Sequence, residues 1–68
     1  MKNISKEDNN YIYFMVGKNV KKYRKLRGIT QKELANRCNY SENFIGDIEN
    51  NTFKTFSLNA IYHISKVL

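Results

Sequence analysis

Apolar residues recur at helical spacing in four segments of the chain, residues 11–27, 31–38, 42–50 and 58–68. Gly28 is expected to end the first segment. No run alternates with the period of two that a half-buried strand shows, and the chain has no Pro and only three Gly. The expected inward positions of the first and last segments are Val16, Val20, Tyr23, Leu58, Ile61, Ile64 and Leu68. The pattern therefore predicts an all-α domain of four helices.

The second and third segments carry the capping and turn residues of two short helices joined by a tight turn. Thr30 can cap the first of them, and Glu33 stands three residues later, as in a capping box. Asn39 follows where the chain must turn sharply, and Asn tolerates a left-handed conformation better than other residues with a side chain. Ser41 can cap the next helix. This arrangement predicts a helix-turn-helix, which presents its second helix to the major groove of DNA.

Composition narrows the class of protein and its partner. The 68 residues suffice for one small domain, and twelve Lys and Arg against six Asp and Glu give a net charge of +6. That surplus suits a polyanion, although ribosomal proteins and membrane-surface helices share it. The single cysteine, Cys38, cannot form an internal disulfide, which agrees with a reducing cytoplasm. The apolar run at residues 11–16 is too short for a membrane span and either covers the core or contacts a second copy.

A larger set of residue types at fixed spacing comprises Arg24, Gly28, Thr30, Gln31, Leu34, Ala35, Ser41, Ile45, Ile48, Glu49, Ser57 and Leu58. With this set, the stretch from Gly17 to Leu68 resembles the phage repressor–Cro (XRE-type) family of helix-turn-helix domains. Two departures are Asn39 and Asn51, which stand where the family usually has Gly. The resemblance implies a compact four-helix domain over residues 11–68, a truncated form of the five-helix repressor-like fold. Residues 1–10 are expected to be a disordered tail.

The resemblance also implies contacts to the DNA backbone. Gln31 lies in the first turn of its helix, where free N–H groups and the helix dipole attract phosphate. Such contacts set position and affinity without reading sequence. For Lys54, a solvated loop charge is an equally good interpretation. The expected phosphate-contacting residues are Thr30, Gln31, Asn50, Thr52, Lys54 and Thr55.

By the same resemblance, the base-reading residues are Glu42, Asn43 and Asp47, at the front of the third helix. Asn can pair with adenine through two hydrogen bonds, and a carboxylate can accept one from cytosine. For the two acids there are alternatives: Glu42 can simply favour the helix dipole, and Asp47 can answer a nearby cation. Phe44 either touches a thymine methyl or packs at the domain edge. Gly46 either allows close approach to DNA or is neutral.

Arg24 and Glu49 match two positions that form an internal ion pair in the family. The alternative is two separately solvated charges. An internal pair would tie the first helix to the recognition helix, with little net stability but a large penalty if one partner were lost.

The sequence thus predicts a cytoplasmic, sequence-specific transcriptional regulator that binds double-stranded DNA as a homodimer on a palindromic operator. The alternative is a protein-interaction module, such as the antitoxin of a toxin–antitoxin pair. An enzyme is not expected, because the chain has no nucleophile–base pair and no Gly-rich phosphate loop. His63 and Cys38 supply two possible metal ligands, short of the usual four. We therefore expect no metal, no cofactor, no small-molecule ligand and no membrane contact.

Overall fold

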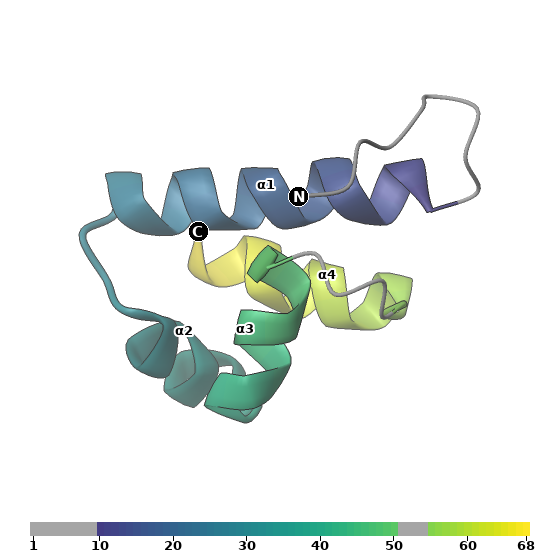
Figure 1. The fold of residues 1–68 in the computed structure, drawn as a ribbon. Helices are drawn as coiled ribbons and strands as arrows, with labels where there is room; N and C mark the ends of the chain where they lie inside the picture. The colour runs from purple at the N-terminus through teal and green to yellow at the C-terminus, as the bar shows by residue number, and fades with distance from the viewer. Residues whose placement is uncertain (1–9, 51–54) are drawn as a thin grey trace.

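The computed structural model describes residues 10–50 and 55–68, and four α-helices account for most of them. They are α1 (Tyr11–Leu26), α2 (Gln31–Cys38), α3 (Glu42–Asn50) and α4 (Leu58–Val67). Figure 1 shows α1 along one side of the molecule, α4 beneath it in the same general direction, and α2 and α3 at the opposite side. These described residues contain no strand. The prediction of a four-helix, all-α domain is confirmed.

Capping residues end the helices of the helix-turn-helix at the positions that the sequence predicts. The Thr30 hydroxyl accepts a hydrogen bond from the Glu33 amide, and the Glu33 carboxylate accepts one from the Thr30 amide, each at 3.0 Å. Asn39 ends α2 in the left-handed conformation, with φ 62° and ψ 38°. Ser41 caps α3, because its hydroxyl accepts a hydrogen bond from the Phe44 amide at 3.1 Å. These caps satisfy backbone groups that would otherwise lack partners at the ends of short helices.

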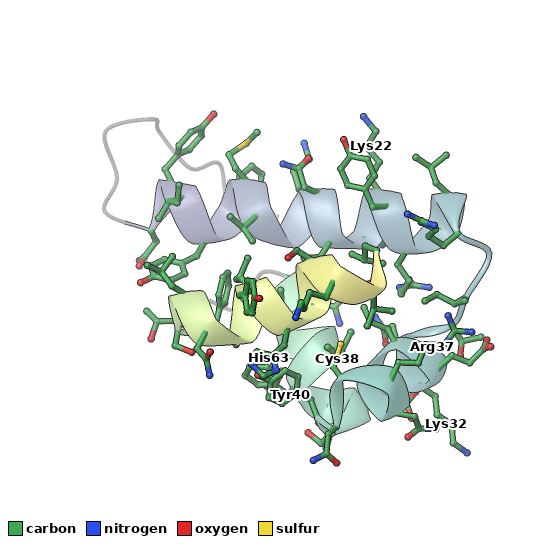
Figure 2. The ribbon with its side chains drawn as sticks, turned by 180° about the vertical axis from the view of Figure 1, so that it is seen from behind. Lys22, Lys32, Arg37, Cys38, Tyr40 and His63 are labelled. Carbon is green, nitrogen blue, oxygen red and sulfur yellow. The ribbon has the colours of Figure 1, made fainter. Side chains whose placement is uncertain are left out.

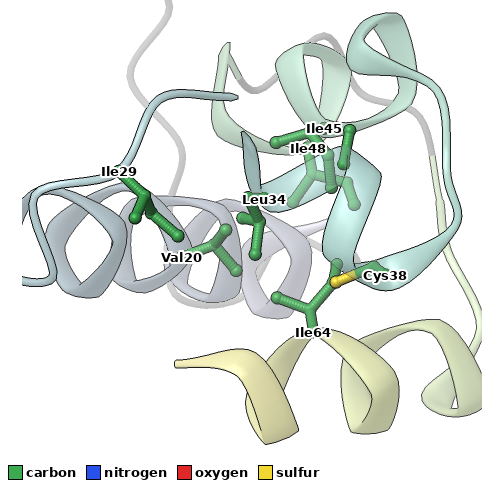
Figure 3. Packing of buried hydrophobic residues seen from close by; sticks show 8 residues of the cluster. Val20, Ile29, Leu34, Cys38, Ile45, Ile48 and Ile64 are labelled. Carbon is green, nitrogen blue, oxygen red and sulfur yellow. The ribbon is translucent and has the colours of Figure 1, made fainter. Parts of the chain in front are cut away.

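The core is a single apolar cluster to which all four helices contribute. Figure 3 shows Leu34 of α2 in the middle of it, between Val20 of α1 and Ile48 of α3. Cys38 points toward Ile64 of α4 in the same view. Leu34 is completely buried. The buried members of the cluster are Val20, Ile29, Leu34, Ala35, Cys38, Ile45, Ile48 and Ile64.

The closest approach between α1 and α3 depends on Gly17, a residue that no pattern in the sequence marks as a contact. Gly17 is buried against the backbone of α3. A Cβ atom there would overlap the Ile48 carbonyl oxygen and lie 3.2 Å from the carbonyl carbon. Glycine inside a helix is unfavourable by about 1 kcal/mol relative to alanine. Here it allows two helix backbones to pack in direct contact.

Two of the expected core positions were wrong. Tyr23 is 50% exposed, because the side of α1 that meets α3 carries Gly17, Val20 and Arg24. Leu58 is 89% exposed, because it opens α4 and the buried residues of that helix begin at Ala60.

Several predictions fall outside the described residues. Residues 1–9 of the expected tail are among them, whereas Asn10 precedes α1 and its carbonyl accepts a hydrogen bond from the Phe14 amide at 3.1 Å. The same holds for Asn51 as a helix cap and for Thr52 and Lys54 as phosphate contacts.

Candidate nucleic-acid interface

A buried network of side chains lies behind the helix-turn-helix. Arg24 of α1 donates to both carboxylate oxygens of Glu49 in α3, from Nε at 2.7 Å and from Nη2 at 3.0 Å. Its third hydrogen bond goes from Nη1 to the Ile29 carbonyl oxygen at 2.8 Å. The expected internal ion pair is therefore present, and the interpretation as two solvated charges does not fit. The pair ties α1 to α3 and to the turn that precedes α2.

This network favours the charged form of Arg24. The hydrogen bond to Glu49 raises the pKa of Arg24 above its ordinary value, although burial acts in the opposite direction. The side chain of Glu49 has no exposed surface and that of Arg24 is 11% exposed. Charge-assisted, bidentate bonds of this kind set the relative orientation of the groups that they join.

Gln31 extends the network to the beginning of α2. Its Nε2 donates to Glu49 Oε1 at 3.1 Å. Gln31 is one of the expected phosphate contacts, and this hydrogen bond gives its amide a second role that only the fold reveals. One of the two amide hydrogens is used by Glu49, and the other remains available to an acceptor outside the protein. Thr30, beside it, is exposed and uses its hydroxyl in the capping box.

The outer face of α3 presents a short row of polar groups next to Gln31. Glu42 and Asn43 are exposed in the first turn. Asp47 is half-buried and is already engaged by a neighbour. Asn50, at the end of the helix, is exposed. The first turn of α3 therefore has the freest side chains for contact with another molecule.

Gly46 lies in the middle of this row, beside Gln31 and Asn50. A Cβ atom at Gly46 would lie 3.6 Å from Gln31 Oε1 and 3.9 Å from Asn50 Nδ2, which are ordinary contact distances. Packing within the domain therefore does not require glycine here. The neighbourhood also shows that Gln31 at the start of α2 and Asn50 at the end of α3 belong to one continuous surface. Thr55, the remaining expected phosphate contact in the described residues, is exposed ahead of α4.

The aromatic residues near the turn pack inside the domain. The rings of Tyr40 and Phe44 lie 4.9 Å apart, and both pack against the core. Phe44 thus has the packing role that was one of its two interpretations. Cys38 is buried, and burial raises the pKa of its thiol. In Figure 2, His63 lies close to Tyr40 on the side of the molecule away from Lys22.

Other kinds of site find little support in the part of the chain that the structure describes. No group of three or more His, Cys, Asp or Glu side chains is placed to hold a metal ion there. Over the same residues, no helix combines the length and the apolar character needed to cross a bilayer.

The fold and the arrangement of α2 and α3 define a helix-turn-helix protein. The family model HTH_3, described as helix-turn-helix, matches residues 20–68. The chain therefore belongs to this family, the Cro-type (XRE) helix-turn-helix domains, and the resemblance noted in the sequence is confirmed. The family is one of DNA-binding regulators of transcription. No match was found among curated proteins or among solved structures.

Proposed function

We propose that this protein regulates transcription by binding, as a dimer, to a palindromic operator, and that the first turn of α3 reads the bases. The observation that carries this proposal is the exposed first turn of α3, with Glu42 and Asn43, on a helix whose other side is buried. Asn43 is the main reader, because an amide can pair with adenine through two hydrogen bonds and carries no charge into the phosphate-lined groove. Asp47, which already has a partner in the domain, is a weaker candidate.

The start of α2 supplies the contacts that hold the domain on the DNA backbone. Gln31 is fixed by Glu49 while it retains a donor, and the α2 N-terminus favours an anion through its dipole. Thr30, Asn50 and Thr55 are exposed around it. Thr52 and Lys54, outside the described residues, belong to the same proposed set.

The proposed dimer follows from the small size of the recognition surface. One helix of this length reads only a few base pairs, and two copies on a two-fold axis place their helices about 34 Å apart, one turn of DNA. An apolar groove of about 330 Å³ between α1 and α4 supports a protein contact away from α3. Val20 and Tyr23 line one side of it, and Ile61, Ile64 and Leu68 the other. Nearby, Phe56 packs edge-on against the Tyr13 ring, 5.0 Å away.

Selection of bound sites from random duplex DNA tests the function. The selected sites are expected to share a motif with two-fold symmetry that two protomers bind. The affinity should fall with increasing salt, and each phosphate contact should contribute about −0.9 to the slope of log affinity against log salt. Asn43→Ala should relax the preference at one position per half-site by about 1–3 kcal/mol. Asn36→Ala, which removes an exposed amide on α2 to which no DNA contact is assigned, is the matched control. An unchanged motif for Asn43→Ala would show that the main reader lies elsewhere.

Gly46→Ala separates two roles of the glycine. The substitution should raise the free energy of unfolding by about 1 kcal/mol, because alanine is the better helix former and its methyl group fits. If DNA approaches the backbone of α3 closely, the same variant should bind its site more weakly despite its higher stability. Equal affinity would mean that Gly46 has no role in DNA binding.

The second candidate function is a protein-interaction module, such as an antitoxin. The exposed side chains of Ile12 and Leu58 favour it, because they line a second apolar hollow, between the first turns of α1 and α4, and clustered exposed apolar side chains often mark protein contacts. Site selection distinguishes the two functions. A protein that enriches no motif, and binds no duplex at low salt, would be an interaction module.

A further inference from the structure

The face of α1 next to α3 carries a row of lysines that the helix-turn-helix does not use. Lys18, Lys21 and Lys25 follow Phe14 at steps of four, three and four residues, so that all four side chains share one narrow face of the helix. They line a groove of about 540 Å³, which we call the basic groove. Its opposite wall is formed by Glu49 and Asn50 at the end of α3.

The lysines of the basic groove are not neutralised within the described residues. Glu49, the acidic residue in the wall, has both oxygens occupied by Arg24 and Gln31. In residues 10–50 and 55–68, Arg24 and Glu49 form the ion pair, and none of the groove lysines forms one. The Lys18 ammonium group lies over the Phe14 ring, 5.3 Å from its centre.

Such a row is unfavourable in the isolated domain. Like charges three and four residues apart on a helix repel each other and destabilise it. The helix dipole favours Lys25 in the last turn of α1, but its effect falls off before Lys18. An external anion that extends along the helix would remove this repulsion. The spacing of the row therefore indicates a partner with a line of negative charges.

The basic groove adjoins the surface that we assign to DNA. Asn50 belongs to both, because it lines the groove and also lies beside Gly46 and Gln31. Lys22 also lines the groove, but it does not belong to the row, and it projects away from α2 and α3 in Figure 2. Only the lysines on the α3 side of α1 can therefore contact a molecule that α3 binds.

We propose that the basic groove binds the phosphate backbone of the same duplex, beside the bases that α3 reads. This inference rests on the proposed function and adds a third backbone contact to the start of α2 and the segment ahead of α4. From Lys18 to Lys25 the row is roughly 10 Å long at 1.5 Å per residue. One strand of duplex rises about 3.4 Å per phosphate along the axis, and its winding makes the separation of neighbouring phosphates about twice as large, so the row spans about two or three phosphates.

The test compares two variants that remove the same total charge. Lys18→Gln/Lys21→Gln changes the groove, and Arg37→Gln/Lys66→Gln changes two exposed cations on α2 and α4 that do not line it. On the selected site, the groove variant should reduce the slope of log affinity against log salt by roughly 0.9 per lost phosphate contact. Its affinity should fall at least tenfold at 0.1 M salt, equally for specific and non-specific DNA. The control variant should change both quantities much less.

Three further arms locate the contact. Lys18→Arg/Lys21→Arg keeps the charges and should bind DNA as tightly as the wild type. Lys22→Gln should weaken DNA binding less than Lys18→Gln or Lys21→Gln alone. Neutral methylphosphonates placed one at a time along the site should weaken the wild-type protein at two or three adjacent positions and leave the groove variant unaffected there. The melting temperature of the groove variant should be at least as high as that of the wild type, because like-charge repulsion is removed.

The outcomes separate the two proposals. If the wild type selects a site and the two charge-matched variants bind it equally, the basic groove has no DNA role and the proposed function stands. If the methylphosphonate positions are the same for the wild type and the groove variant, the inference is also overturned. If the wild type selects no site and binds no duplex, both proposals fail. Binding of the groove lysines to anionic vesicles with no effect on DNA affinity would assign the groove to a membrane surface instead.

Discussion

Replacing Arg24 by Met should destabilise the domain more than replacing Glu49 by Met. In Arg24→Met, the Glu49 carboxylate would stay at a position with no exposed surface and keep Gln31 as its donor. In Glu49→Met, the guanidinium group would keep the Ile29 carbonyl oxygen, and its 11% exposure gives it a path to water. An uncompensated buried charge is the main penalty when such a pair is broken, so the more deeply buried partner should be the worse one to leave behind.

The size of the effect is large for so small a domain. Removing one partner of a buried ion pair costs about 3–5 kcal/mol. At roughly 0.05–0.15 kcal/mol per residue, a domain of this length has a free energy of unfolding on the order of 3–10 kcal/mol. Arg24→Met should therefore remove between about a third and all of the free energy of unfolding. The double variant Arg24→Met/Glu49→Met should be more stable than the sum of the single losses predicts, because no charge remains unpaired.

Urea unfolding of the four proteins of this cycle gives the measurement. All four should be compared in the same concentration of sucrose, which raises stability and keeps the single variants folded. Lys22→Met is the control for loss of a cation from the same helix, and as an exposed substitution it should change stability by less than about 0.5 kcal/mol. Losses that add without coupling, or a Glu49→Met variant that is the less stable of the two, would refute the reasoning.

Three further predictions follow from the described contacts. Gly17→Ala should lower the free energy of unfolding by about 1–3 kcal/mol, since its methyl group overlaps the Ile48 carbonyl, and a melting temperature at or above that of the wild type would contradict the close approach of the helices. Alkylation of Cys38 at pH 8 should be slow in the native protein and should accelerate in urea, since burial raises the pKa of its thiol. Hydrogen bonds from the Thr30 amide and hydroxyl lower the pKa of Glu33. The Glu33 carboxylate therefore stabilises the fold above the ordinary pKa of 4.5, and this stabilisation is lost as the pH falls through the lower pKa of the folded state. Glu33→Gln should therefore give a melting temperature that depends less on pH in that acidic range.

The parts of the fold that short-range signals determine were predictable from the sequence. Thr30 and Glu33 form a capping box wherever that spacing begins a helix, and Asn39 needs only a turn to adopt its left-handed conformation. Burial of Ile64 followed from the periodicity of its segment. These features depend on residues within a few positions of one another, and the sequence contains them directly.

The rotation of α1 could not be read in the same way. Periodicity favoured its apolar side, with Tyr23, as the inner face, whereas the structure turns Gly17 and Arg24 toward α3. A glycine and an arginine count as polar positions in a hydrophobic pattern, although one allows close backbone contact and the other satisfies a buried acid. The Gln31–Glu49 hydrogen bond likewise joins residues 18 positions apart, beyond the reach of local spacing.

The buried network then has a role that net stability does not describe. A buried ion pair contributes little to the free energy of folding compared with apolar residues of the same size, but it admits few alternative arrangements. Through Arg24 and Gln31, Glu49 fixes α1 and the start of α2 relative to α3. If α1 rotated about its axis, the lysine row would leave the side on which Asn50 lies. The pair that holds Gln31 at its proposed phosphate contact also holds Lys18 and its neighbours beside α3. Loss of Arg24 should therefore weaken DNA binding beyond the fraction of protein that it unfolds.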